Sequence, residues 1–214
     1  MLRASFFLKI LAVIFFGILA FAFADYPPIA KCNHPSAMAN FNQKKFLSGK
    51  WYVTKAEHGS DSTVCRQYKG KFNNEKQQFI GDGYYTFQNQ TFYFTVRCSR
   101  VQNTDGQPPM KFICTQKNPD IAQMTFQFQL EVTVRDTDYR TYAVMYRCVQ
   151  FPQELGSHFE DNTLLIQRNA NLEVDENKIE KTLSLSFDSF RSRNDVNGGC
   201  PELPSKKKNK KPKT

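Results

Sequence analysis

The chain has 214 residues, of which 29 are basic and 20 are acidic, so its formal net charge is +9. This excess lies at the two ends: outside the first 24 and the last ten residues, 21 basic residues face 20 acidic ones. Such a nearly neutral body excludes a domain that binds nucleic acid through a basic surface.

The first 24 residues have the features of a secretory signal peptide. Arg3 and Lys9 accompany a run of Leu, Ile, Phe and Ala, and the segment ends in Ala22-Phe23-Ala24, the small-x-small pattern of a cleavage site. A transmembrane anchor is the alternative, but no second apolar run of about 20 residues follows. We therefore expect residues 1–24 to be removed and the remaining 190 to form one secreted domain.

Strand patterns dominate the rest of the chain. Short segments rich in aromatic and β-branched residues, each bounded by Gly, Pro, Asn or Asp, follow one another at 84–87, 91–97, 111–115, 141–149 and 163–167. Apolar and polar residues alternate over 124–134, which predicts a strand with one buried face. With a first strand at 49–52 there are at least seven strands. Seven strands without alternating helices predict a meander barrel or a sandwich.

One helix is predicted near the end of the chain. Ile179, Leu183, Phe187 and Phe190 recur at helical spacing after the acidic stretch 175–177, which can cap a helix. We expect this helix to pack on the outside of the strands. The last residues, 205–214, have no apolar side chains to bury and are expected to form a disordered tail.

The six cysteines indicate disulfides. An even number in a secreted chain predicts three bridges, and about 15 connectivities are open from spacing alone. A zinc or redox site is the weaker alternative, because the chain has no Cys-x-x-Cys and only three histidines. The cysteines are Cys32, Cys65, Cys98, Cys114, Cys148 and Cys200.

Three local patterns, in order along the chain, resemble the signatures of the lipocalin family. The motif residues are Gly49 and Trp51 in the first strand, Thr137, Asp138 and Tyr139 between two later strands, and Arg168 after a late strand. The resemblance implies an all-β fold, an eight-stranded antiparallel up-and-down barrel with a C-terminal α-helix and three disulfides, over residues 25–204. It also implies that Arg168 packs against Trp51, the only tryptophan, at the closed end of the barrel.

A narrower resemblance links the chain to the salivary lipocalins of blood-feeding triatomine bugs. It rests on Cys32, on segments 41–54 and 142–148, and on 164–169. It implies the bridges Cys32–Cys148 and Cys65–Cys200, which leaves Cys98 and Cys114 to join neighbouring strands. Haem-binding members of this group carry a histidine on a strand where this chain reads Gly-Tyr-Tyr-Thr-Phe at 83–87, so we expect no haem and no other cofactor or metal.

The sequence carries none of the motifs of common hydrolases, metalloenzymes or nucleotide-binding loops, so we expect no catalytic residue and no enzyme activity. The barrel instead predicts an apolar cup that binds a small ligand. The residues expected to line it are Tyr84, Phe126, Phe128, Leu130, Tyr142, Val144 and Tyr146.

Relatives in the resembling group bind eicosanoids, biogenic amines or ADP. The aromatic interior favours a hydrophobic or aromatic host mediator, an eicosanoid or an amine, because a buried nucleotide needs several converging basic residues. Arg97 and Arg147 lie in strands but can face outward. The resemblance thus implies a monomeric salivary lipocalin that sequesters a host mediator and so inhibits platelet aggregation or vasoconstriction.

The lysine-rich tail supports an alternative function. In this alternative the protein is an anticoagulant that uses the barrel as a rigid platform. Its lysines bind a heparin-like glycan, an anionic phospholipid or an acidic coagulation factor. A solvated tail is the simpler interpretation. The lysines concerned are Lys206, Lys207, Lys208, Lys210, Lys211 and Lys213, and Asn89 lies in a glycosylation sequon in a predicted turn.

Overall fold

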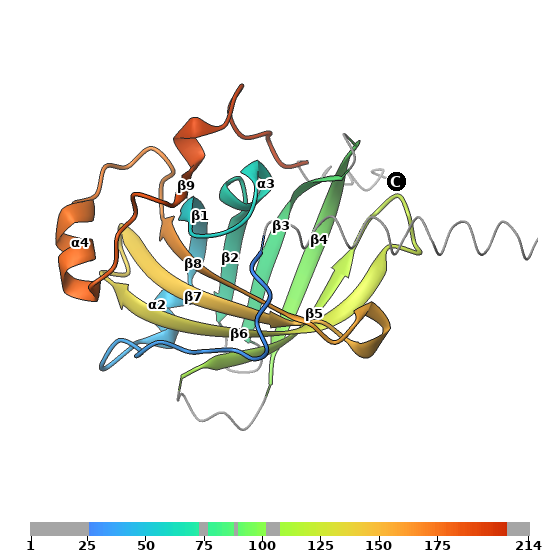
Figure 1. Ribbon diagram of the computed structural model, residues 1–214, viewed down its shortest axis with the longest axis horizontal. Coiled ribbons are helices and arrows are strands. Elements are labelled where there is room, and N and C mark those ends of the chain that lie inside the picture. Colours follow the sequence, from blue (N-terminus) through green and yellow to red (C-terminus); the bar gives the residue numbers. More distant parts are fainter. Residues whose placement is uncertain (1–25, 73–76, 88–89, 102–107, 205–214) are drawn as a thin grey trace, which may run out of the picture.

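The computed structural model describes residues 26–72, 77–87, 90–101 and 108–204, and shows a closed barrel of eight antiparallel strands (Figure 1). Each strand pairs with the next along the chain, and β1 pairs with both β2 and β8 to close the barrel. The strands are β1 Gly49–Ala56, β2 Gln67–Phe72, β3 Gln77–Phe87, β4 Gln90–Arg100, β5 Met110–Lys117, β6 Thr125–Thr137, β7 Tyr142–Gln150 and β8 Phe159–Gln167. The predicted fold class is confirmed.

The short strand β9 (Arg191–Ser192) pairs with the end of β1. The helices are α2 Gln43–Phe46, α3 Asp61–Val64 and α4 Glu176–Leu183, with 3₁₀ turns at Gln153–Leu155 and Arg193–Asp195. Within the described residues, no helix is long and apolar enough to span a bilayer. The predicted signal peptide, Asn89 of the predicted sequon and the lysine-rich tail lie outside the described residues.

Helix α4 packs on the outside of the barrel, as predicted, but is shorter than the apolar spacing suggested. Asp175 caps its first turn by accepting a hydrogen bond from the Lys178 amide. The helix ends at Leu183, because Ser184 adopts a left-handed conformation with φ of 49°. Phe187 therefore lies beyond the helix, yet it is buried in the cluster that joins α4 to the outer faces of β7 and β8.

The end of the barrel where β1 begins is closed by aromatic packing; we call it the Trp51 end. The Arg168 guanidinium lies 3.5 Å from the centroid of the fully buried Trp51 ring. Arg168 also donates hydrogen bonds to the carbonyls of Ser48, Lys50, Lys45 and Tyr139. The role implied for Arg168 is thus confirmed as structural.

The Thr137-Asp138-Tyr139 motif forms the tight turn between β6 and β7. The Asp138 carboxylate accepts hydrogen bonds from the amides of Arg140, Thr141 and Tyr142. Thr137 Oγ1 donates to the Tyr142 carbonyl and accepts from the Tyr139 amide. Tyr139 has φ of 65°, and its carbonyl accepts from Arg168 Nε, so the turn supports the closed end.

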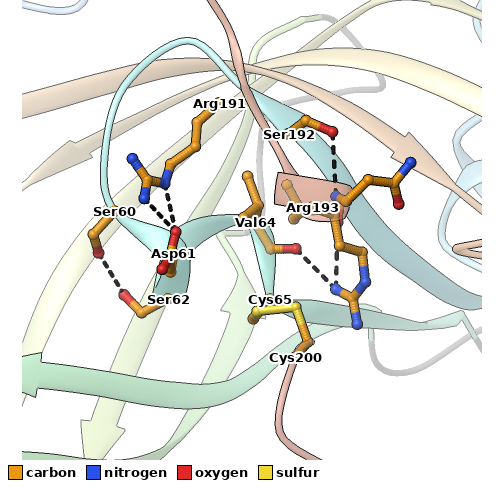
Figure 2. Close-up of a disulfide and its surroundings, with 11 residues drawn as sticks. Ser60, Asp61, Ser62, Val64, Cys65, Arg191, Ser192, Arg193 and Cys200 are labelled. Carbon is orange, nitrogen blue, oxygen red and sulfur yellow. Dashed lines mark hydrogen bonds and ion pairs between the residues drawn. A yellow bond between two sulfur atoms is a disulfide. The ribbon is translucent and has the colours of Figure 1, made fainter. Parts of the chain in front are cut away.

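The three implied disulfides are present, and two of them tie the N-terminal and C-terminal segments to the barrel. Cys32–Cys148 holds the N-terminal segment against β7, and Cys98–Cys114 joins β4 to β5 inside the barrel. Cys65–Cys200 fixes the C-terminal segment beside α3. Figure 2 shows that Arg191 contacts Asp61 and Arg193 donates to the Val64 carbonyl at the same place.

Candidate ligand site inside the barrel

A group of polar and charged side chains gathers inside the half of the barrel where β1 runs into α3, opposite the Trp51 end. We call it the arginine cluster. Its members are Tyr26, Arg66, Tyr68, Tyr85, Arg147, Glu160 and Asn162.

Arg147 is the centre of this cluster. It lies on β7 opposite Val132 of β6 and Asn162 of β8, and 6% of its surface is exposed. Its Nη2 donates to the Tyr26 hydroxyl at 2.7 Å, and its guanidinium lies 5.4 Å from the centroid of the Tyr26 ring. Its Nε is buried and has no hydrogen-bond partner among the described residues. A buried guanidinium is thus only partly satisfied by the protein.

Arg66 enters the cluster from the position just before β2. Its guanidinium stacks on the Tyr85 ring at 4.5 Å from the ring centroid. Its Nε is also buried and unpaired among the residues that the structure describes. Tyr68, which is 7% exposed, and Tyr26 act electrostatically on this guanidinium as well. Two cations therefore lie in one enclosed region of the barrel. Burying two like charges costs free energy unless opposite charges or hydrogen bonds compensate them.

The compensation within the cluster is incomplete. Glu160 is the carboxylate that acts on both Arg66 and Arg147. Burial alone would lower the pKa of Arg147, but Tyr26 and Tyr68 beside it raise that pKa. Burial raises the pKa of the Tyr26 phenol, yet the two guanidiniums outweigh it and leave the pKa below its usual value. The cluster thus carries two positive charges against one carboxylate, an environment that favours an anion.

Apolar side chains line the interior next to the cluster. Tyr85 meets the buried Phe94 ring edge to face, with centroids 5.3 Å apart. Val96 is buried nearby on the same strand, and the Cys98–Cys114 disulfide lies farther along that strand, in the core. Charged and apolar surfaces therefore adjoin each other, which suits a ligand with one anionic end and one apolar end.

Three of the predicted ligand residues face the interior. Leu130 belongs to the core, and Phe128 packs against it. Phe126 lies farther along the same face of β6, with its ring 6.1 Å from Phe128 and 6.2 Å from Phe151. The alternation over 124–134 therefore gave the correct face of β6.

The predicted orientation of β7 is wrong. Val144 packs against Ile179 of α4 on the outside of the barrel, and Tyr142 joins the same outer cluster. The Tyr146 hydroxyl accepts from the Asn33 amide and donates to Asp161, also outside. The error arises because β7 is buried on both faces, so its sequence does not alternate.

Tyr84 is likewise on the outer face of its strand. Its ring packs against Tyr93 at 5.3 Å, whereas its neighbour Tyr85 contacts Arg66 in the interior. Arg97, the other strand arginine, pairs with Asp82 on the same outer face as Tyr84. The sequence analysis thus missed Arg66 and Tyr85, and it left open which way Arg147 faces. One signal could have settled the orientation of Arg147, because its neighbour Cys148 forms a disulfide on the outside of the barrel.

A second polar group ties the N-terminal segment to the barrel. Cys32, His34 and Glu131 lie within 4.8 Å of one another, but Cys32 is bridged and offers no thiolate to a metal. His34 Nε2 lies 2.5 Å from Glu131 Oε2, and its Nδ1 lies 2.9 Å from Thr133 Oγ1. This group therefore fastens the segment to β6.

A groove of about 770 Å³ lies on the outside of the barrel beside Cys200. It is lined by Arg168, Arg193 and several asparagines. The two guanidiniums donate to backbone carbonyls, Arg168 at the closed end and Arg193 to Val53 and Val64. Because these donors already serve the fold, the interior cluster is the stronger candidate site.

Comparisons with known proteins place the chain among triatomine proteins. The triabin family model matches residues 22–179. Triafestin-2 of Triatoma infestans is 69% identical over 201 residues, which cover 94% of this chain and 98% of Triafestin-2. The tryptamine complex of the amine-binding protein of Rhodnius prolixus has a TM-score of 0.58 at 19% identity and covers 76% of this chain and 86% of that one. A mutant of LTBP1 in complex with leukotriene C4 has a TM-score of 0.52 at 22% identity, with 78% and 97% covered, so both structures share the barrel fold.

Proposed function

Because this chain belongs to the triabin family, we propose that it is a secreted salivary lipocalin that binds a small mediator of host haemostasis or vascular tone inside its barrel. It acts stoichiometrically, by lowering the free concentration of the mediator, and not by catalysis. Platelet aggregation or vasoconstriction at the bite is then inhibited. Such a role needs a tight site and an abundant protein.

The arginine cluster is the observation that supports this proposal and selects among ligand classes. An amine carries a positive charge and would be repelled by Arg66 and Arg147. ADP carries more negative charge than one uncompensated cation can balance, and its sugar and base are polar. An eicosanoid has one carboxylate and a long apolar chain, which match the cations and the adjoining apolar wall at Phe94 and Val96.

Calorimetric titration of the mature chain, residues 25–214, tests the proposal. The ligands are leukotriene C4, a thromboxane mimetic, serotonin, noradrenaline and ADP, and a chain ending at residue 204 controls for charge attraction by the tail. We expect stoichiometric binding of an eicosanoid with a negative heat-capacity change, the mark of apolar burial. Tighter binding of an amine would contradict the choice of class, and failure of all five ligands would contradict the proposal itself.

We also propose that the protein works without haem. His34 is paired to Glu131, and His158 stacks on Phe151 at 4.4 Å between ring centroids. His58 borders the arginine cluster, where its backbone exchanges hydrogen bonds with the Asn162 side chain and its ring meets the Tyr26 ring edge to face. The two neighbouring guanidiniums disfavour an iron cation beside His58. Haemin added to the mature chain should give no Soret band of the histidine-ligated type. Such a band, lost on substitution of one histidine, would overturn this expectation.

The lysine tail supports a second candidate function, binding of a sulfated glycan, an anionic membrane or an acidic protein such as a coagulation factor. Six lysines lie within ten residues of a chain whose body is almost neutral. Each lysine near an anionic surface contributes about 1 kcal/mol at low salt. Retention on heparin should fall when residues 205–214 are deleted; unchanged retention would exclude the tail as the clamp.

A further inference from the structure

On one edge of the Arg147 guanidinium, only one of the two N–H donors makes a hydrogen bond to the described part of the chain. Nε and Nη2 lie on the same edge of the group, the edge along which a carboxylate accepts two parallel hydrogen bonds. Nη2 donates to the Tyr26 hydroxyl, while Nε is buried without a partner in the described part of the chain. A single phenol oxygen thus sits where a carboxylate would satisfy both donors.

The phenol oxygen of Tyr26 is surrounded as a bound anion would be. Besides Arg147, the side-chain amide of Asn162 lies 3.4 Å from it and Thr63 Oγ1 lies 3.3 Å away. The Tyr26 hydroxyl also occupies the space beside Gly59, where a Cβ atom would approach it to 2.9 Å. The phenol oxygen is therefore enclosed by three hydrogen-bonding side chains and by the backbone of Gly59, which has no Cβ atom.

Tyr26 reaches this position on a short arm, residues 26–31, which makes few contacts with the barrel besides those of Tyr26 itself. The Cys32–Cys148 disulfide and the His34–Glu131 contact hold the chain that follows against β6 and β7. Between Tyr26 and Cys32, the described backbone pairing with the barrel is one isolated bridge, from Ile29 to Phe159. The arm can therefore leave the cluster while the disulfide keeps the rest of the segment in place.

We propose that Arg147 and Arg66 form a carboxylate subsite, and that Tyr26 occupies it as an intramolecular substitute that the ligand displaces. This rests on the proposed function, since it names the part of the ligand that the barrel recognises. The carboxylate accepts from Nε and Nη2 of Arg147, and it offers a charge to the unpaired Arg66 Nε. The exchange replaces one neutral acceptor by an anion and balances the second cation, which Glu160 leaves uncompensated.

Substitution of the phenol tests the displacement. Tyr26→Phe keeps the ring and removes the competing oxygen, so the subsite is free for a carboxylate. The probes are cis-parinaric acid and its methyl ester, which share the same chain and differ in charge. The matched control is Tyr142→Phe, because the Tyr142 hydroxyl donates to Asp136 on the outer face of β7.

We expect the full mature chain to bind the acid at least tenfold more tightly than the ester. Tyr26→Phe should raise the affinity for the acid about tenfold or more, the value of one hydrogen bond from a charged donor, and leave the ester unchanged. Tyr142→Phe should change neither. Binding of the acid should also speed tryptic cleavage after Lys31, which is already exposed, because release of Tyr26 frees the backbone on the N-terminal side of that bond.

Each other outcome has a defined meaning. If the ester binds as tightly as the acid, the carboxylate subsite is wrong and the proposed function survives. If Tyr26→Phe lowers or does not change the affinity for the acid, Tyr26 is a fixed part of the structure and the displacement is wrong. If neither probe binds to the unsubstituted protein or to Tyr26→Phe, and none of the five mediators binds either, the proposed function and the carboxylate subsite are both wrong.

Discussion

Replacing Arg147 by methionine should separate recognition of the ligand from stability of the barrel. Methionine matches the length of the arginine stem and fills the interior without a charge. The variant loses the two donors of the Nε–Nη2 edge, so affinity for an anionic mediator should fall by about 2–4 kcal/mol, or roughly 30- to 1,000-fold. The neutral methyl ester should bind about as tightly as before.

Stability should change little in this variant, because two effects oppose each other. The hydrogen bond from the charged guanidinium to Tyr26 is lost, which costs about 1.5–3 kcal/mol, while the desolvation of a cation that is 6% exposed is relieved. Calorimetry gives the affinities, and thermal unfolding checks the fold. Arg97→Met is the matched control, since Arg97 pairs with Asp82 on the outer face of β4. Retention of affinity within threefold in a folded Arg147→Met would refute the assignment of the anion site.

Three further predictions concern the frame that holds the site. Arg168→Ala removes four hydrogen-bonded carbonyl contacts and the stacking on Trp51, so the free energy of unfolding should fall by about 2–4 kcal/mol in denaturant titration; a change below about 0.5 kcal/mol would contradict that role. Partial burial raises the pKa of Asp138, but its hydrogen bonds outweigh burial and hold that pKa below its usual value. The contribution of Asp138 to the free energy of unfolding is therefore present above about pH 4 and is lost as the pH falls through the lowered pKa. Asp138→Asn should weaken this acid dependence of the unfolding free energy. The double variant Cys98→Ser with Cys114→Ser should lower stability by about 3 kcal/mol, the value expected for a closed loop of this length, and an unchanged melting temperature would exclude a stabilising role for the bridge.

The sequence was most informative where one face of a strand meets solvent. Along β6, polar residues such as Gln127 and Gln129 are exposed while Phe128 and Leu130 turn inward, so the alternation identified both the strand and its inner face. The motif residues at the Trp51 end were equally clear, because their roles depend on local geometry that a short pattern can specify.

The strand β7 shows why the site itself could not be read from the sequence. Both of its faces are covered, the inner one by the core and the outer one by α4 and the N-terminal segment, and almost every residue is buried. A continuous apolar run fixes no orientation, since a shift of one residue exchanges the two faces. The single charged residue in that run, Arg147, points inward against the usual expectation for arginine.

The disulfide pattern nevertheless contains the missing information. Cys148 must face outward to reach Cys32, because the N-terminal segment lies outside the barrel. Successive side chains of a strand point to opposite faces, so Arg147 must then face the interior. The same bridge anchors the arm that carries Tyr26 back to Arg147. One covalent link thus sets the orientation of the anion-binding side chain and the attachment point of the residue proposed to compete with the ligand for it.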